Sequence, residues 1–295
     1  MALQVPTSDG RVLEVLTAGP EDGFPLVFHH GTPGAAVPDR EADAAAAQRG
    51  LRTIRYSRPG YGGSSPRPQG AETARVADDV DDVLAILDHL GHDDFVTMGW
   101  SGGGPRSLAC AALAPERCRA ATCGVGIAPY TEFQGDLLAG MAQENIEELG
   151  AALEGPEPLA RYLEGWTSIF SVSAEEVAES LGGLAPPVDR AALTGERAEN
   201  AAAVFRHAGE QGTVGWQHDD LALLRPWGFS VKDIGVPVAV WQGTEDTMVP
   251  FAHAEWLVAN IPGVRAHLVE GEGHISLKAQ MPRILDDLRD LAGLG

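Results

Sequence analysis

Residues 99–103, with the sequence Gly-Trp-Ser-Gly-Gly, constrain the fold more than any other part of the chain. The apolar run 95–98 before them predicts a β-strand, and residues 102–114 after them predict a helix that Pro115 ends. A serine between glycines in such a turn is held with its hydroxyl exposed at the carboxyl edge of a sheet. The segment therefore predicts an α/β fold with a nucleophile at Ser101.

Strand-like and helical runs alternate on both sides of this segment. Further strands are expected at residues 11–17, 25–29, 51–56, 119–126, 236–242 and 264–269, and further helices at 37–48, 72–90, 251–259 and 282–291. Repeated strand and helix units predict a mostly parallel, doubly wound sheet with helices on both faces.

The alternation stops between residues 129 and 228, where helical segments separated by glycines and prolines follow one another. Since strands resume after this stretch, the sheet is expected to include both ends of the chain. We therefore expect a core domain made of residues 1–128 and 229–295, and a helical insertion at 129–228.

A serine hydroxyl is a weak nucleophile until a base takes its proton, and an acid must hold that base in one tautomer. Asp246 lies just after the expected strand 236–242, and His274 lies just after the expected strand 264–269. Both therefore belong at the carboxyl edge of the sheet with Ser101. Glu245 is the adjacent alternative for the acid. The chain order Ser, Asp, His is that of hydrolases with this kind of serine turn.

The negative charge that develops on an attacked carbonyl oxygen needs two preorganised N–H donors. The amide of Gly102 is one candidate, because it lies at the unpaired N-terminus of the helix after the serine. The second donor is expected from the loop 30–34 (His-Gly-Thr-Pro-Gly) after an early strand, and the Thr32 amide is the candidate. His30 is expected to brace this loop through hydrogen bonds.

In five segments the chain resembles the serine hydrolases of the alpha/beta-hydrolase fold. They are residues 30–34, 58–64 (Arg-Pro-Gly-Tyr-Gly-Gly-Ser), 99–103, 243–246 and 273–274. Together they span nearly the whole chain outside the insertion. The resemblance implies the alpha/beta-hydrolase fold, and it implies that residues 129–228 form a helical cap over the active site.

Departures from particular relatives narrow the resemblance. Dehalogenases and epoxide hydrolases of this fold carry aspartate at the nucleophile position, where this chain has Ser101. Prolyl aminopeptidases usually show Gly-Gly-Ser-Trp-Gly around the serine, whereas here Trp100 precedes it. The longer glycine run of hormone-sensitive-lipase relatives after the oxyanion His-Gly is also missing.

Aromatic side chains are concentrated in and just after the insertion, namely Trp166, Phe170, Trp216, Trp227 and Phe229. Most are expected in its core, and some in an apolar pocket with Trp100, Met248 and Phe251. Of these, Trp100, Trp216 and Met248 are the candidate substrate-binding residues.

These features predict a cofactor-independent serine hydrolase that cleaves a small carboxylic ester through an acyl-enzyme. The same residues suit a proline-iminopeptidase-like aminopeptidase or a C–C bond hydrolase. An aminopeptidase needs carboxylates to hold a free amine, and Glu144, Glu147, Glu148, Glu196 and Glu199 could supply them. A ligand-binding receptor of the same fold with lost or slow catalysis is the alternative outside enzymes. Perhydrolysis, a cofactor-free haloperoxidase-like side activity, is a further possibility.

The 295 residues include 42 acids and only 21 lysines and arginines, which gives a net charge of −21. Such a charge disfavours nucleic acids and anionic membranes as partners, and at long range it favours a neutral, partly apolar small molecule as substrate. No run approaches the roughly 20 apolar residues of a membrane span. The start of the sequence, residues 1–10, lacks signal-peptide features, so the cytoplasm is expected. We expect a monomer or homodimer.

No bound cofactor or metal is expected. The glycines of residues 60–63 lack the lysine of a phosphate-binding loop. His89 and His92 have no clustered carboxylate beside them, and the aspartates of residues 78–82 lack the pattern of a calcium loop, which favours a solvated helix face. Cys110, Cys118 and Cys123 are expected to be buried free thiols.

Overall fold

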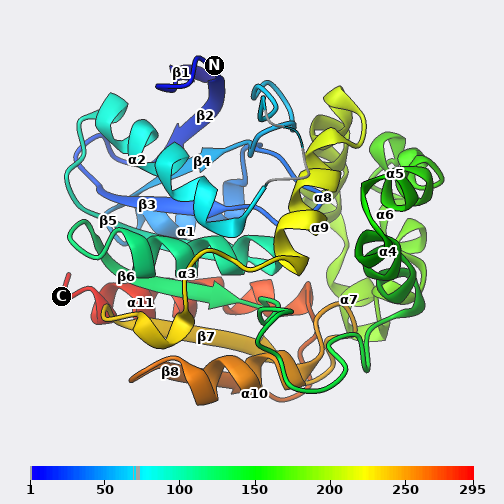
Figure 1. Cartoon of the computed structure of the whole chain (residues 1–295). Coiled ribbons are helices and arrows are strands. Elements are labelled where there is room, and N and C mark those ends of the chain that lie inside the picture. The colour runs from blue at the N-terminus through cyan, green and yellow to red at the C-terminus, as the bar shows by residue number, and fades with distance from the viewer. Residues whose placement is uncertain (1, 69, 71–73) are drawn as a thin grey trace.

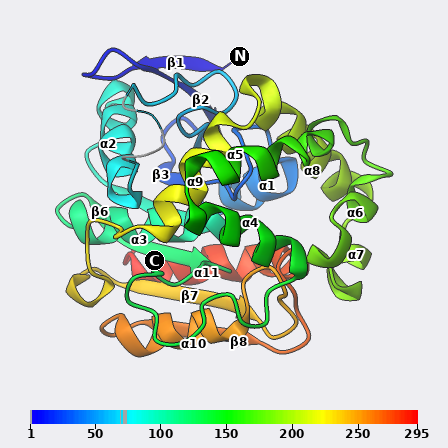
Figure 2. The same ribbon diagram turned by 45° about the vertical axis from the view of Figure 1, so that its right-hand side comes forward.

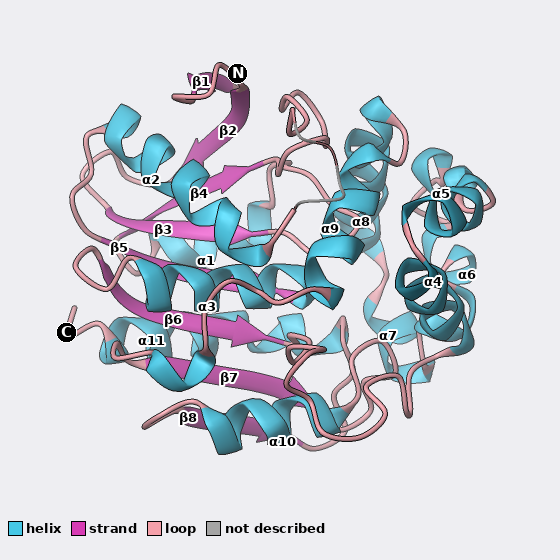
Figure 3. Cartoon of the chain, in the orientation of Figure 1, coloured by secondary structure: helices cyan, strands magenta, loops and turns pink. Residues whose placement is uncertain are grey.

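Eight strands form one sheet in the computed structural model, which describes residues 2–68, 70 and 74–295. They are β1 (Leu3–Pro6), β2 (Val12–Ala18), β3 (Phe24–His29), β4 (Leu51–Tyr56), β5 (Phe95–Trp100), β6 (Cys118–Gly124), β7 (Val238–Gly243) and β8 (Arg265–Val269). Their order across the sheet is β1-β2-β4-β3-β5-β6-β7-β8. The pairs β1–β2 and β2–β4 are antiparallel and the others are parallel, which confirms the mostly parallel sheet (Figure 3).

Helices cover both faces of the sheet (Figure 1). On one face lie α2 (Asp79–Leu90), α3 (Gly104–Leu113) and α10 (Phe251–Asn260), and on the other lie α1 (Arg40–Ala47) and α11 (Met281–Leu291). Alternate residues of a strand point to opposite faces, so two hydrophobic cores form. In β7, Val238 and Val240 join the core beneath α2, α3 and α10, whereas Ala239 and Trp241 join the core beneath α1 and α11.

The chain between β6 and β7 is helical, as the sequence predicts. It contains α4 (Gln143–Glu154), α5 (Pro156–Glu164), α6 (Val177–Ser180), α7 (Pro187–Ala192), α8 (Gly195–Ala208) and α9 (Val214–Leu224). Most of these helices gather at one end of the sheet, beyond the carboxyl ends of the parallel strands (Figures 1 and 2). We call them the inserted helices.

Three elements differ from the sequence-based predictions. The short strand β1 was not expected, and it pairs with β2 at the edge of the sheet. The helix expected over 37–48 begins only at Arg40, where Asp39 caps it by accepting a hydrogen bond from the Ala42 amide. The helix expected over 72–90 starts at Asp79 after a 3₁₀ turn at Val76–Asp78, and residues 72–73 lie outside the described residues.

The expectation of a solvated acidic helix face at residues 78–82 is wrong for two of the aspartates. Asp79 and Asp82 are buried on α2, with 6% and 1% of their surface exposed. Arg67 Nη2 lies 2.6 Å from Asp79 and 3.1 Å from Asp82, and Arg11 forms two hydrogen bonds to Asp82. Buried carboxylates need such partners, and here both arginines come from outside the helix, 12 to 71 residues away from the aspartates.

Cys110, Cys118 and Cys123 are free and buried, as predicted. Within the described part of the chain, no helix has both the length and the hydropathy needed to cross a membrane.

Candidate active site

Ser101 occupies the sharp turn between β5 and the helical turn Ser101–Gly103 that precedes α3. Its φ of 56° lies in the left-handed region that β-carbon-bearing residues rarely adopt. The flanking glycines make this turn possible, because a Cβ on Gly99 would overlap the carbonyl oxygen of Gly103, and one on Gly103 would overlap that of His29. The predicted strained serine turn is therefore present.

Asp246 and His274 meet at the same edge of the sheet, on the loops after β7 and β8. His274 Nδ1 lies 2.8 Å from Asp246 Oδ2. The carboxylate of Asp246 also accepts hydrogen bonds from the amides of Met248 and Val249 and from Gln242 Nε2, at 2.8 to 2.9 Å. Because Nδ1 of His274 faces the acid, Nε2 is the ring nitrogen available to accept a proton.

The loop that carries His274 is held by Asp189 from helix α7 of the inserted helices. The buried Asp189 carboxylate accepts hydrogen bonds from the amides of His274, Ile275 and Ser276 at 2.8 to 2.9 Å. On the other side, Trp100 Nε1 donates to the His274 carbonyl oxygen at 3.2 Å. The main chain on both sides of the imidazole is therefore fixed.

The loop 30–34 packs directly against the serine turn. A Cβ placed on Gly31 would lie 3.4 Å from Ser101 Cβ, and one placed on Gly102 would lie 3.4 Å from the Thr32 amide nitrogen. The structure thus brings together the two main-chain groups predicted to hold an oxyanion, Thr32 and Gly102. Their catalytic roles, like those of Ser101, Asp246 and His274, remain predictions.

His30 braces this loop, as expected from the sequence. Its Nδ1 lies 2.7 Å from the Gly31 carbonyl oxygen, and its Nε2 accepts a hydrogen bond from the Arg58 amide at 3.1 Å. Since Nε2 is the acceptor, Nδ1 carries the proton and donates to Gly31. Burial, aided by the nearby Arg58 guanidinium, holds the pKa of His30 well below its ordinary value, so the ring is neutral.

Asp219 of helix α9 connects both halves of the expected oxyanion site. Thr32 Oγ1 donates to Asp219 Oδ2 at 2.7 Å, and Arg106 Nη2 donates to Asp219 Oδ1 at 2.9 Å. The same Arg106 donates to the Gly102 carbonyl oxygen at 2.5 Å. Arg58 completes the network with hydrogen bonds to Asp219 and to the carbonyl oxygens of His30 and Gly31. Burial alone would raise the pKa of Asp219, but the guanidiniums of Arg58 and Arg106 hold it far below its ordinary value.

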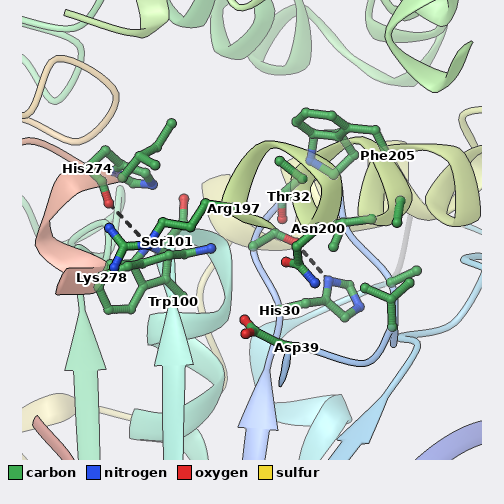
Figure 4. Close-up of a pocket in the computed structure, with 18 of the residues that line it drawn as sticks. His30, Thr32, Asp39, Trp100, Ser101, Arg197, Asn200, Phe205, His274 and Lys278 are labelled. Atoms are coloured by element: carbon green, nitrogen blue, oxygen red, sulfur yellow. Dashed lines mark hydrogen bonds between the residues drawn. The ribbon is translucent and has the colours of Figure 1, made fainter. Parts of the chain in front are cut away.

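A cavity of about 550 Å³ lies between this edge of the sheet and the inserted helices. Ser101, His274 and Thr32 line it, and so do all three candidate substrate-binding residues, Trp100, Trp216 and Met248. Figure 4 shows Ser101, Trp100 and His274 on one side of this cavity and Thr32 and His30 on the other. The volume is in the range of sites that enclose a small organic molecule.

The other aromatic side chains of the insertion divide between the cavity and the protein core. Trp166 and Phe205 line the cavity. Trp227 and Phe229 pack against each other with ring centroids 5.7 Å apart, as part of the core. Phe170 also packs against this core and does not line the cavity, so three of the five aromatics serve the core, as expected. Phe251, which was expected at the pocket, does not line it.

The sequence analysis did not identify four residues that hold the candidate site residues in place through hydrogen bonds, namely Gln242, Asp189, Asp219 and Arg106. Local signals exist only for Gln242, which lies four residues before Asp246 on the same strand-to-loop segment. The two aspartates lie in inserted helices 85 and 187 residues from their partners His274 and Thr32, so no local spacing indicates the contact.

Among the described residues, no group of three or more histidine, cysteine, aspartate or glutamate side chains is arranged to hold a metal ion.

Comparisons with known proteins agree with this architecture. The non-heme chloroperoxidase of Streptomyces lividans is 28% identical over 257 residues, covering 85% of this chain and 84% of the relative. A hydrolase from Pseudomonas aeruginosa has a solved structure that superposes with a TM-score of 0.70 at 21% identity, covering 99% and 98% of the two chains. An esterase from a Rhodococcus species superposes with a TM-score of 0.66 at 19% identity, covering 99% and 98%.

The two structural likenesses show the fold. The family model described as alpha/beta hydrolase fold matches residues 25–278, a range that includes Thr32, Ser101, Asp246 and His274. With most of its length matched in this way, the chain belongs to the alpha/beta hydrolase fold family.

Proposed function

We propose that this protein is a serine hydrolase that cleaves small carboxylic esters through an acyl-enzyme intermediate. One observation carries the proposal: Ser101, in its left-handed turn, shares a cavity with His274, whose Nδ1 is held 2.8 Å from the buried Asp246. This arrangement supplies a nucleophile, a base and an orienting acid.

In the proposed reaction, Ser101 Oγ attacks the ester carbonyl carbon while His274 takes the hydroxyl proton. The amides of Thr32 and Gly102 bind the oxyanion. The bond to the alcohol breaks as His274 returns the proton to the leaving oxygen. Water, activated by His274, then attacks the acyl carbon, releases the acid and restores Ser101.

We infer that the inserted helices act as the cap that encloses the substrate. Trp166, Phe205 and Trp216 bring apolar surface to the cavity, which favours an ester with an apolar part. Trp100 and Met248 add apolar surface from the core side.

The direct test is hydrolysis of p-nitrophenyl acetate by wild-type protein and by Ser101→Ala. We expect the variant to lose at least about 1,000-fold in kcat, because it removes the attacking atom. A fluorophosphonate probe should label the wild type on Ser101 and leave the variant unlabelled. Full turnover by Ser101→Ala would refute the assignment of Ser101 as the nucleophile.

An aminopeptidase is less well supported, because the glutamates of the cavity are either exposed, as Glu196 and Glu199 are, or already engaged. Glu144 is occupied by a hydrogen bond from the Gly183 amide at 2.7 Å. Glu148 accepts from Trp216 Nε1 at 2.7 Å and is hydrogen bonded to the buried Asp220. Burial raises the pKa of Glu148 to about 7, so this side chain is a poor partner for a substrate ammonium near neutral pH. Turnover of an aminoacyl anilide in preference to an ester would reverse this conclusion.

Perhydrolysis is the second candidate activity, because the relative that covers 85% of the chain is named a chloroperoxidase. Hydrogen peroxide in place of water would attack the acyl-enzyme, break the bond to Ser101 Oγ and release a peroxy acid. Peroxy acid formation from an ester and hydrogen peroxide, lost in Ser101→Ala, would establish it. Wild-type protein that forms no peroxy acid above the uncatalysed rate would exclude it.

A further inference from the structure

Two cations that line the cavity, Arg40 and Lys278, have no ion-pair partner among the described residues, and Arg40 is exposed. Arg55 and Arg197 also line the cavity, but Arg55 pairs with Asp43 at 2.9 Å and Arg197 pairs with Glu41 through two hydrogen bonds. Lys278 lines the same cavity and is partly buried. Within the part of the chain that the structure describes, no carboxylate lies within 4 Å of its ammonium group.

The position of Lys278 follows from the loop that carries His274. The 3₁₀ helix Ser276–Gln280 begins two residues after His274, so Lys278 lies about one helical turn further along and faces the same cavity. The Lys278 ammonium lies 6.0 Å from the centre of the Trp100 ring, which precedes the nucleophile. Figure 4 shows Lys278, Trp100 and Ser101 on the same side of the cavity.

The surroundings of the Lys278 ammonium group do not balance its positive charge with a nearby negative charge. Burial lowers the pKa of Lys278, and Arg55 and Arg197 act in the same direction, whereas Asp39 and Glu41 oppose them from beyond ion-pair distance. The Asp39 carboxylate is already used as the cap of α1, and Glu41 is held by Arg197. A partly desolvated ammonium without a close counter-ion gains most from an anion that enters the cavity.

We propose that Lys278 binds a carboxylate of the substrate, so that the preferred ester carries an anionic group besides the ester bond. This inference rests on the proposed esterase function and deepens it. The net charge of −21 favours a neutral substrate at long range, but screening confines that field to about 8–10 Å at physiological salt. Glu196 and Glu199 also line the cavity but are exposed, so the partly buried Lys278 ammonium is the group inside it that favours an anion.

The test compares matched pairs of esters that differ by one carboxylate. p-Nitrophenyl hemiglutarate against p-nitrophenyl butyrate places the charge on the acyl side, and 4-acetoxybenzoate against its methyl ester places it on the alcohol side. For at least one pair, wild-type protein is expected to prefer the anionic ester. In Lys278→Met, the ratio of kcat/KM for that pair should fall about tenfold or more, because a charge-assisted hydrogen bond is lost.

Two further variants make the comparison specific. Lys278→Arg keeps the charge and should retain most of the preference. Lys232→Met is the matched control, because Lys232 is the only other lysine of the chain and is exposed outside the cavity. That control should leave the ratio unchanged.

A binding measurement separates this inference from the proposed function. Isothermal titration of glutarate and of benzoate into wild-type protein and Lys278→Met needs no turnover, and at least one of the two should bind about tenfold more weakly to the variant. If no ester is hydrolysed but this difference is found, the esterase proposal fails and the anion site stands. If esters are hydrolysed by way of Ser101 while Lys278→Met changes neither ratio nor binding, the anion site is refuted.

Discussion

At the scale of single residues, the site depends on a strained backbone held in place by close packing. A left-handed conformation at a serine costs on the order of 1–3 kcal/mol, and it persists only where the surroundings fix it. Here the surroundings are Gly99 and Gly103, which allow the turn to close, and Gly31, which lies against Ser101. The strain places the hydroxyl at the cavity instead of within the helix.

Thr32 offers a test of how the expected oxyanion site is held. Its hydroxyl donates to Asp219 at 2.7 Å, and this bond fixes the residue whose amide is expected to bind the oxyanion. Thr32→Val keeps the side-chain shape but loses the bond, so we expect kcat for p-nitrophenyl acetate to fall about tenfold with a smaller change in KM. Thr32→Ser keeps the hydroxyl and should stay near wild type. Equal kcat values for Thr32→Val and wild type would contradict this role.

At the scale of elements, two of the inserted helices each carry a buried aspartate that contacts the core domain. Asp189 of α7 caps three amides of the loop that carries His274, and Asp219 of α9 joins the loop of Thr32 to the helix after Ser101. A Cβ on Gly273 would also come within 2.5 Å of Asp189 Oδ1, which explains glycine before the histidine. The insertion therefore helps to shape the candidate site.

The contact of α7 predicts a linked loss of stability and activity in Asp189→Asn. The amide side chain turns one acceptor into a donor that faces a main-chain N–H, so we expect the free energy of unfolding to fall by about 2–3 kcal/mol. Because the loop of His274 loses its clamp, kcat for p-nitrophenyl acetate should fall as well. Urea unfolding and ester hydrolysis measure the two effects. Asp233→Asn, at an exposed aspartate, is the control and should change neither.

A second contact between an inserted helix and the sheet predicts a pH-dependent stability. His207 of α8 lies 2.7 Å from Glu14 of β2, and this hydrogen bond, opposed by partial burial, raises the pKa of His207 to about 8. A histidine whose pKa is raised on folding contributes stability that is complete below about pH 6.5 and is lost as pH rises through 8. The shift corresponds to at most about 2 kcal/mol, since one pKa unit is about 1.4 kcal/mol.

Urea unfolding of wild-type protein and His207→Gln at pH 6 and pH 9 measures this contribution. The two proteins should differ clearly in unfolding free energy at pH 6 and much less at pH 9. A difference that is the same at both pH values would mean that the charge of His207 does not stabilise the fold.

At the scale of the whole molecule, the sequence predicts what neighbouring residues encode and fails where distant segments meet. Short stretches of sequence predict the serine turn, the loops of Asp246 and His274, and the alternation of strands and helices. The structure has these elements where the sequence predicts them. The sequence does not reveal that Asp79, Asp82, Asp189 and Asp219 are buried, because their partners are 12 to 187 residues away. Burial of a charge depends on the tertiary partner, which periodicity does not reveal.

These buried links predict how the whole chain unfolds. Asp189, Asp219 and the pair of Glu14 and His207 tie the inserted helices to the sheet, so separating the two layers would leave charges buried without partners or hydrate them at the cost of the core packing. Core and insertion should therefore melt together, in one calorimetric transition with an enthalpy of about 200 kcal/mol for 295 residues near 60 °C. The van't Hoff enthalpy should equal the calorimetric one.

Two resolved transitions, or a van't Hoff enthalpy near half the calorimetric value, would mean that the inserted helices unfold as a separate unit. In that case Asp219→Asn would shift only the transition of that unit, whereas in a single cooperative molecule it lowers the one melting temperature.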